Sequence, residues 1–313
     1  FLPDQPESLT TALVILLIVF LSGSFFLRIR RTSLARGAGW LLALIVMPLV
    51  HFLLSDAPAG FRMLALIVVL FQLMKNLCAI EHRNRQWSFS KWVLFSFGWV
   101  GMNPVPLFRR GNRPLPSWSL DMMTGVSRIA IGVAVIWGLR MLAPQSPGTG
   151  IQSALVALTL LVALSLVLHF GMLRINTAVL RYLGYPVPVL FKRPYLSRSL
   201  REFWGRRWNI PFVEMTSSIV YRPLRRYLPV TIALFATFLF SGLLHEIAIS
   251  VSVKACYGLP LIYFLIQALA MLLEDHFKFR GSLWVLAMLL PLPILFHTPF
   301  MQEIVWPILG PGF

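Results

Sequence analysis

Long apolar segments alternate with short polar segments along this chain of 313 residues. A helix that spans a bilayer needs about 20 mostly apolar residues. The segments at 129–142 and 259–273 fall short of this length, so we expect them to be tilted, partly buried or re-entrant. The eight segments that we expect to span a membrane are 10–27, 38–54, 63–80, 129–142, 151–173, 230–251, 259–273 and 283–300.

A further apolar stretch, 92–108, is interrupted by Gly98, Gly101, Pro104 and Pro106. Glycine and proline at these positions break a continuous helix. We therefore expect a helix that lies on the membrane surface or re-enters the membrane and that leaves it through a proline-rich segment.

Composition excludes several classes of protein. Apolar residues make up 58% of the chain and charged residues only 12%, whereas soluble domains carry about a quarter charged residues. The hydrophobicity excludes a disordered chain, and two cysteines cannot form a disulfide scaffold. No repeat or low-complexity linker divides the sequence. We predict an all-α, polytopic membrane protein that forms a single domain over residues 1–313.

Basic residues outnumber acidic residues by 28 to 11, which gives a net charge of +17. In a soluble protein this excess would suggest nucleic acid as a partner. Here the loops at 28–36, 83–128, 174–226 and 278–280 hold four, seven, eleven and two of the basic residues. The positive-inside rule explains this distribution. It predicts cytoplasmic basic loops, external termini and contact with membrane lipid, without nucleic acid.

The first predicted span, 10–27, does not look like a cleaved secretory signal. No basic residue precedes it and arginines follow it, which is the reverse of the charge order in a signal peptide. Because the chain begins with Phe1 rather than methionine, we expect further residues to precede it.

His245 lies deep in the otherwise apolar span at 230–251, about 20 Å along the helix from its start. Ionisable side chains are costly at this depth and usually face protein or a watery cavity. Thr237, Ser241 and Ser252 share its helix face by their spacing. This polar stripe predicts either a hydrated tunnel or a polar contact between helices in which His245 simply bonds to a neighbour.

Glu246 follows His245 directly and projects about 100° around the helix from it. We expect it to be a buried acid or the partner of an arginine. The zinc motif HExxH would need a second histidine at position 249, which is isoleucine. No metal site is therefore predicted.

The most unusual polar run is SLREFWGRRWN, which contains Trp204, Arg206, Arg207, Trp208 and Asn209. Tryptophans flanking arginines are typical of the membrane interface, where guanidinium groups reach phosphates. An amphipathic surface helix explains this composition without any catalytic role. The alternative is a site that contacts a substrate.

Two motifs in the segment 191–251 together resemble a known family. SLREFWGRRWN is followed, 36 residues after its asparagine, by the histidine of FLFSGLLHE. This order resembles the wax-synthase-like branch of the membrane-bound O-acyltransferase superfamily. The sequences HFG at 169–171 and GWVGMNP at 98–104 also resemble segments of its bacterial members.

The resemblance implies a multi-spanning enzyme, expected in the inner membrane of a bacterium, that uses acyl-CoA as a co-substrate and no cofactor. The acceptor would be a lipophilic alcohol. His245 matches the intramembrane histidine, a general base for the alcohol, and Asn209 matches an asparagine or aspartate that could donate to the oxyanion or orient His245. The residues expected to contact substrate are Trp204, Arg206, Arg207, Trp208, Ser241, Glu246 and His169.

Three other functions remain open from the sequence. The enzyme could use a short acyl donor and an isoprenoid or polyketide alcohol. A proton-coupled transporter could relay protons through His245 and Glu246, although that class often shows inverted repeats, and none is visible here. The protein could also be a membrane scaffold without catalytic activity. Replacing His245 by alanine separates the enzymes from the last two.

Overall fold

The computed structural model describes residues 6–142 and 150–310, and within these ranges every regular element is a helix. This confirms the prediction of an all-α, polytopic membrane protein. Seven helices are long and apolar enough to span a bilayer. They are α1 (Pro6–Phe26), α2 (Thr32–Leu53), α3 (Ala59–Glu81), α5 (Trp118–Leu142), Ile151–Tyr182 (α6, η3 and α7), Val230–Val253 (α11 and α12) and α13 (Leu259–Phe277).

Several of the predicted boundaries were wrong. Helix α2 begins at Thr32 rather than near residue 38, and the span from Ile151 ends at Tyr182 rather than at residue 173. Helix α5 begins at Trp118 rather than near residue 129, because Asp121 is buried and paired within the protein instead of lying in a loop. Helix α13 extends to Phe277, four residues beyond its predicted end. The predicted span 283–300 is divided, first at Pro291 and again at residues 296–297, into α14 (Ser282–Leu289), α15 (Leu292–Leu295) and α16 (Thr298–Phe300).

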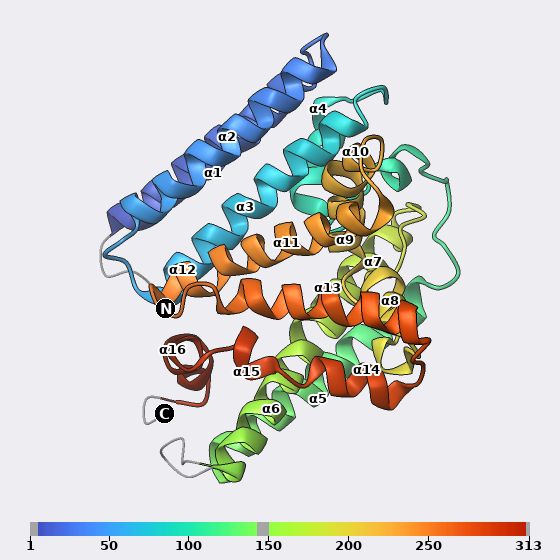
Figure 1. Ribbon diagram of the computed structural model, residues 1–313. Coiled ribbons are helices and arrows are strands. Elements are labelled where there is room, and N and C mark those ends of the chain that lie inside the picture. The colour runs from blue at the N-terminus through green and yellow to red at the C-terminus, as the bar shows by residue number, and fades with distance from the viewer. Residues whose placement is uncertain (1–5, 143–149, 311–313) are drawn as a thin grey trace. The chain divides into compact units, whose positions relative to one another are not determined.

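The chain divides into two compact units, and the first consists of Phe1–Val105 and Arg193–His297. Within this unit α1 and α2 pack against α3, and α3, α11 (Val230–Ala248) and α13 lie side by side (Figure 1). The predicted interrupted segment forms α4 (Phe89–Val93), the π-helical turn η1 (Leu94–Gly98) and the 3₁₀ turn η2 (Val105–Phe108).

A buried lysine fixes the turn after η1 to α3. The ammonium group of Lys75 donates to the backbone carbonyls of Trp99 and Gly101, at 2.7 and 2.5 Å, and lies 3.9 Å from the centre of the Phe95 ring. Lys75 is completely buried. Two carbonyl acceptors and an aromatic face therefore replace the water that this charge loses.

The second unit consists of Pro106–Lys192 and Thr298–Phe313. Here α5 packs closely on α6 (Ile151–Ser165), η3 (Leu166–Met172) and α7 (Leu173–Tyr182). Asp121 on α5 pairs with Arg174 and Arg181 at 2.7 and 2.6 Å. The unit ends with η7 (Met301–Val305) and η8 (Trp306–Ile308). The prediction of one domain over residues 1–313 stays a prediction.

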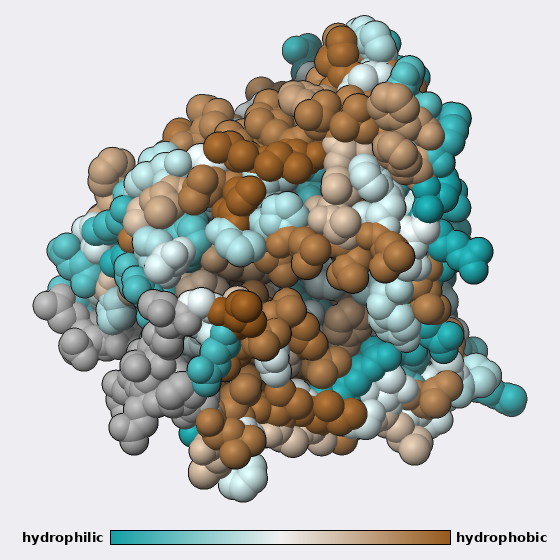
Figure 2. Space-filling view, turned by 60° about the horizontal axis from the view of Figure 1, so that its bottom comes forward, coloured by the Kyte–Doolittle hydropathy of each residue, from teal (hydrophilic) through white to brown (hydrophobic). Residues whose placement is uncertain are grey.

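Hydrophobic side chains cover much of the face shown in Figure 2. On α1 and α2, Leu17 and Leu44 are 54% and 71% exposed. Soluble proteins rarely expose apolar surface this extensively. Exposed leucines along these long helices are the surface expected of helices that face lipid.

The segment between α7 and α11 consists of short helical turns instead of a membrane span. Their order within the first unit is η4 (Pro194–Leu196), α8 (Leu200–Glu202), η5 (Phe203–Arg207), α9 (Ile210–Thr216), η6 (Ser217–Tyr221) and α10 (Arg222–Leu224). This segment contains the run SLREFWGRRWN and packs on α11 and α13.

Candidate active site

His245 is held in one orientation by a hydrogen bond along α11. Its Nδ1 lies 2.7 Å from the backbone carbonyl oxygen of Ser241. Because a carbonyl oxygen only accepts, the neutral ring carries its hydrogen on Nδ1 and leaves the lone pair on Nε2. The rings of Phe264 and Phe212 flank the imidazole, with centroids 4.2 and 5.3 Å away. His245 thus presents a proton acceptor in a fixed position.

The polar stripe on α11 continues from His245 to Ser241 and Thr237. The Ser241 hydroxyl donates to the Thr237 carbonyl at 2.8 Å, and the Thr237 hydroxyl donates to the Ala233 carbonyl at 2.7 Å. These bonds use the hydroxyl hydrogens and leave oxygen lone pairs available.

Ser252 does not continue this stripe, contrary to the prediction from its spacing. Helix α11 ends at Ala248, and Ile249, with φ −105° and ψ −70°, interrupts the regular helix before α12 (Ser250–Val253). Ser252 is buried and its hydroxyl donates to the Ile249 carbonyl at 2.7 Å. A face extrapolated at 100° per residue fails beyond such a break.

Asn209 begins α9 in the left-handed region, with φ 43° and ψ 59°. Asparagine adopts this conformation more readily than most residues. Its side-chain oxygen accepts the backbone N–H of Phe212 at 3.4 Å, as an N-cap does. The amide nitrogen has no hydrogen-bond partner in the ranges 6–142 and 150–310. Asn209 therefore retains N–H donors for another molecule.

The two residues meet at one cavity of about 330 Å³ inside the first unit. Its wall is formed by the segment before α11 together with α11 and α13. The lining residues are Arg201, Trp204, Gly205, Trp208, Asn209, Phe212, Val213, Thr216, Ser217, Tyr221, Leu234, Thr237, Phe238, Ser241, His245, Phe264 and Met271.

Both tryptophans of SLREFWGRRWN form part of this wall. Trp204 donates its indole N–H to the Gln267 side-chain oxygen at 3.1 Å. Trp208 stacks on Phe203, with ring centroids 5.6 Å apart and an angle of 11°. These contacts hold the rings against the protein and leave them facing the cavity.

Comparison with known proteins agrees with these motifs. The membrane bound O-acyl transferase family matches residues 187–266, a range that contains every cavity-lining residue except Met271. The probable long-chain-alcohol O-fatty-acyltransferase 7 of Arabidopsis thaliana is 32% identical over 178 residues, which cover 50% of this chain and 51% of that protein. Over residues 187–266 this chain is similar to the membrane-bound O-acyltransferase family.

Two further relatives carry similar names. The probable long-chain-alcohol O-fatty-acyltransferase 1 of Arabidopsis thaliana is 25% identical over 251 residues, covering 66% of this chain and 70% of that protein. The long-chain-alcohol O-fatty-acyltransferase of Simmondsia chinensis is 38% identical over 73 residues, or 21% of each chain. The chain thus spans about half the length of the first of these relatives and 70% of the length of the second.

The predicted arginines lie beside the cavity wall instead of in it. Arg206 is exposed, and Arg207 pairs with Glu202 at 2.6 Å. The N–H of Arg198 and the Arg207 guanidinium hold the pKa of the Glu202 carboxyl below its usual value. Arg201, which the sequence did not single out, lines the cavity and pairs with Asp275.

Glu246 does not line the cavity, and its partners are not arginines. Its carboxylate accepts the backbone N–H groups of Gly258 and Leu261, at 2.7 and 3.3 Å, and so caps the start of α13. His169 lies in η3 of the second unit, with Nδ1 3.2 Å from the Ser165 hydroxyl. Contact of Glu246 and His169 with substrate stays a prediction.

Helix α13 supplies residues that the sequence analysis missed. Phe264 flanks His245, Gln267 accepts from Trp204, and Met271 lines the cavity. Their spacing of three and four residues places them on one helix face, and the polar Gln267 in an apolar span was the available signal. In the described ranges, no three His, Cys, Asp or Glu side chains gather as metal ligands.

Proposed function

We propose that this protein transfers an acyl group from acyl-CoA to the hydroxyl group of a lipophilic alcohol. The meeting of the His245 imidazole and the Asn209 side chain at one cavity carries the proposal. The names of the relatives support a fatty acyl donor and a long-chain alcohol acceptor. The aromatic wall, which includes Phe212, Phe238 and Phe264, suits a hydrocarbon chain.

In this proposal His245 is the general base. The alcohol oxygen attacks the thioester carbonyl carbon while Nε2 of His245 takes the hydroxyl proton. The carbon–sulfur bond then breaks, and CoA leaves as a thiolate that receives this proton from the imidazolium. The Nδ1–H bond to the Ser241 carbonyl supports the role because it keeps Nε2 unprotonated before the attack.

Asn209 is the proposed donor to the carbonyl oxygen of the thioester. Negative charge develops on that oxygen as the tetrahedral intermediate forms, and a fixed amide N–H stabilises it. The bond from Phe212 N–H to the Asn209 oxygen orients the side chain before substrate binds. No covalent acyl-enzyme is needed, because the thioester is already activated.

We place the basic segment between α7 and α11 on the cytoplasmic side, as expected for an inner-membrane protein. Its excess of arginine and lysine supports this orientation, and acyl-CoA is a cytosolic polyanion. Arg201 at the cavity wall and the exposed Arg206 are the proposed first contacts for the CoA phosphates.

The test is ester formation in membranes that contain the wild-type protein or the variant His245→Gln, with labelled fatty acyl-CoA and a long-chain alcohol. We expect the variant to lose about 100-fold or more of the activity. His82→Gln is the matched control, because His82 makes the same Nδ1 contact to a carbonyl four residues earlier, at 2.9 Å, outside the cavity. More than about a tenth of wild-type activity in His245→Gln would contradict the base role.

A further inference from the structure

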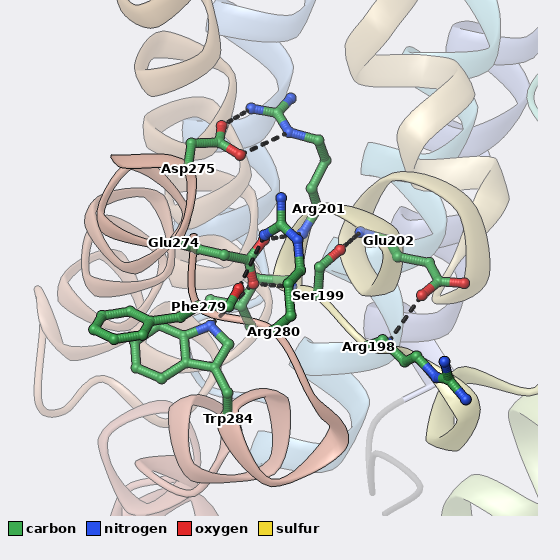
Figure 3. Close-up of polar contacts among 10 residues, drawn as sticks. Arg198, Ser199, Arg201, Glu202, Glu274, Asp275, Phe279, Arg280 and Trp284 are labelled. Carbon is green, nitrogen blue, oxygen red and sulfur yellow. Dashed lines mark hydrogen bonds and ion pairs between the residues drawn. The ribbon is translucent and has the colours of Figure 1, made fainter. Parts of the chain in front are cut away.

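A buried acid, Glu274, lies in the last turn of α13 and is not part of the cavity wall. It is completely buried, and four donors surround it (Figure 3). One carboxylate oxygen accepts the Leu200 N–H at 2.6 Å and the Trp284 indole N–H at 2.9 Å. The other carboxylate oxygen lies 3.4 Å from the backbone nitrogen of Arg201 and 3.2 Å from the guanidinium group of Arg280.

Two of these donors are the first backbone N–H groups of α8, which lies at the start of SLREFWGRRWN. The first turn of a helix has no internal acceptors for its N–H groups. The Ser199 hydroxyl accepts the Glu202 N–H at 3.0 Å, and Glu274 accepts those of Leu200 and Arg201. Glu274 therefore ties the start of this run to α13 through the backbone.

The same face of α13 reaches the proposed catalytic base. Phe264, Gln267, Met271 and Glu274 follow one another at intervals of three or four residues. The Phe264 ring flanks His245, and Gln267 binds the Trp204 indole. About 15 Å of rigid helix thus separates the residue beside His245 from the carboxylate that holds the start of α8.

We propose that Glu274 is a positioning residue for acyl transfer. By fixing the beginning of α8 against α13, it sets where Asn209 and Trp204 lie relative to His245. The proposal rests on the proposed function. A carboxylate suits the task because it offers lone pairs to four donors and no competing N–H group.

The experiment measures kcat and both KM values for purified Glu274→Gln with fatty acyl-CoA and a long-chain alcohol. Glutamine has nearly the same shape, but its NH₂ group would face N–H donors. We expect kcat to fall about 10- to 100-fold, because small misplacements of reacting groups are costly. Both KM values should stay within about twofold of wild type.

Glu81→Gln is the matched control. Glu81 ends α3, binds Arg36 through two contacts of 2.5 and 2.6 Å and does not line the cavity. The control makes the same chemical change at another helix end, so kcat should stay within about twofold of wild type. Trp284→Phe removes one donor to Glu274 and preserves an aromatic ring. This second variant should lower kcat by a smaller factor without lowering the unfolding temperature.

The outcomes separate the two proposals. An inactive wild type would contradict the proposed function itself. With an active wild type, a kcat within twofold in Glu274→Gln, or a change confined to KM, would overturn the positioning role. If Glu274→Gln does not accumulate as folded protein, Trp284→Phe decides: a lower kcat at unchanged stability supports the proposal, and an unchanged kcat overturns it.

Discussion

Asn209 combines a structural and a proposed chemical role, and substitution can separate them. Its left-handed conformation and its oxygen, which caps α9, serve the fold. Its amide N–H serves the proposed oxyanion. Aspartate keeps an oxygen for the cap and tolerates the same conformation, but it has no amide N–H. Asn209→Asp therefore keeps the cap, removes the proposed donor and adds a negative charge that opposes the developing oxyanion.

The expected magnitudes differ among three variants of Asn209. Alanine loses the cap, at about 0.5–2 kcal/mol, and must adopt the left-handed conformation, at about 1–2 kcal/mol. Glycine adopts that conformation freely and replaces the cap at a cost of a few tenths of a kcal/mol. Aspartate should leave stability nearly unchanged. All three lose the donor, which is worth about 10²–10³ in kcat.

The assay combines kcat for ester formation with thermal unfolding in detergent. We expect kcat to fall at least about 100-fold in all three variants, while only the alanine variant unfolds at a clearly lower temperature. Lys254→Ala is the control for a loss of stability away from the cavity, because it removes the bond from the Lys254 ammonium group to the Ser55 carbonyl at 2.8 Å. The backbone of Lys254 is also in the left-handed region, with φ 55°, and Lys254 does not line the cavity. It should lose stability and keep its kcat.

An aspartate variant with kcat within about threefold of wild type would refute the oxyanion assignment. In that case Asn209 would act through its side-chain oxygen rather than its N–H group, either by capping α9 or by orienting His245. A rise in the KM for acyl-CoA at unchanged kcat would instead place the side chain in ground-state binding.

Three further results are expected. Replacing both Arg206 and Arg207 by glutamine should raise the KM for acyl-CoA more than the KM for the alcohol. Rising salt should reduce the difference in the acyl-CoA KM between variant and wild type, because salt screens the wild-type contacts. Equal changes in both KM values would contradict phosphate binding. In a chain whose exposed Cys256 is replaced by serine, a cysteine at Tyr195, which is 68% exposed, should react with an impermeant maleimide only after cells are opened; labelling of intact cells would invert the topology. Gln267→Leu leaves the Trp204 indole N–H without its acceptor, so the unfolding free energy should fall by about 1–3 kcal/mol and kcat should fall with it; an unchanged unfolding temperature would contradict this.

Most spans could be predicted from the sequence because lipid requires long apolar helices whatever their neighbours are. The start of α5 could not. Asp121 looks like a loop residue in the sequence, but Arg174 and Arg181 pair with it inside the second unit. Such pairing joins residues more than 50 positions apart, and a local count of charges cannot detect it.

The same limit explains which site residues were found. His245 was recognisable because a lone imidazole inside an apolar span is unusual. Glu246 and Glu274 are both acids in apolar helices, and in the local sequence only the neighbouring His245 distinguishes Glu246. Their partners differ: Glu246 caps the next helix, whereas Glu274 accepts from Leu200, 74 positions earlier. Sequence reasoning therefore chose the acid next to His245 and missed the other.

Helix periodicity also has a limited range in this chain. It placed Thr237, Ser241 and His245 correctly because α11 is regular from Val230 to Ala248. The run SLREFWGRRWN contains the π-helical turn η5, in which the number of residues per turn differs from 3.6. A face calculated at 100° per residue therefore drifts across this run. Trp204, Trp208 and Asn209 face the cavity because η5 is a π turn and Asn209 is in the left-handed conformation. A variant that converts η5 to a regular helix should therefore rotate these three side chains together. Its activity should fall further than that of a variant that loses only one of them.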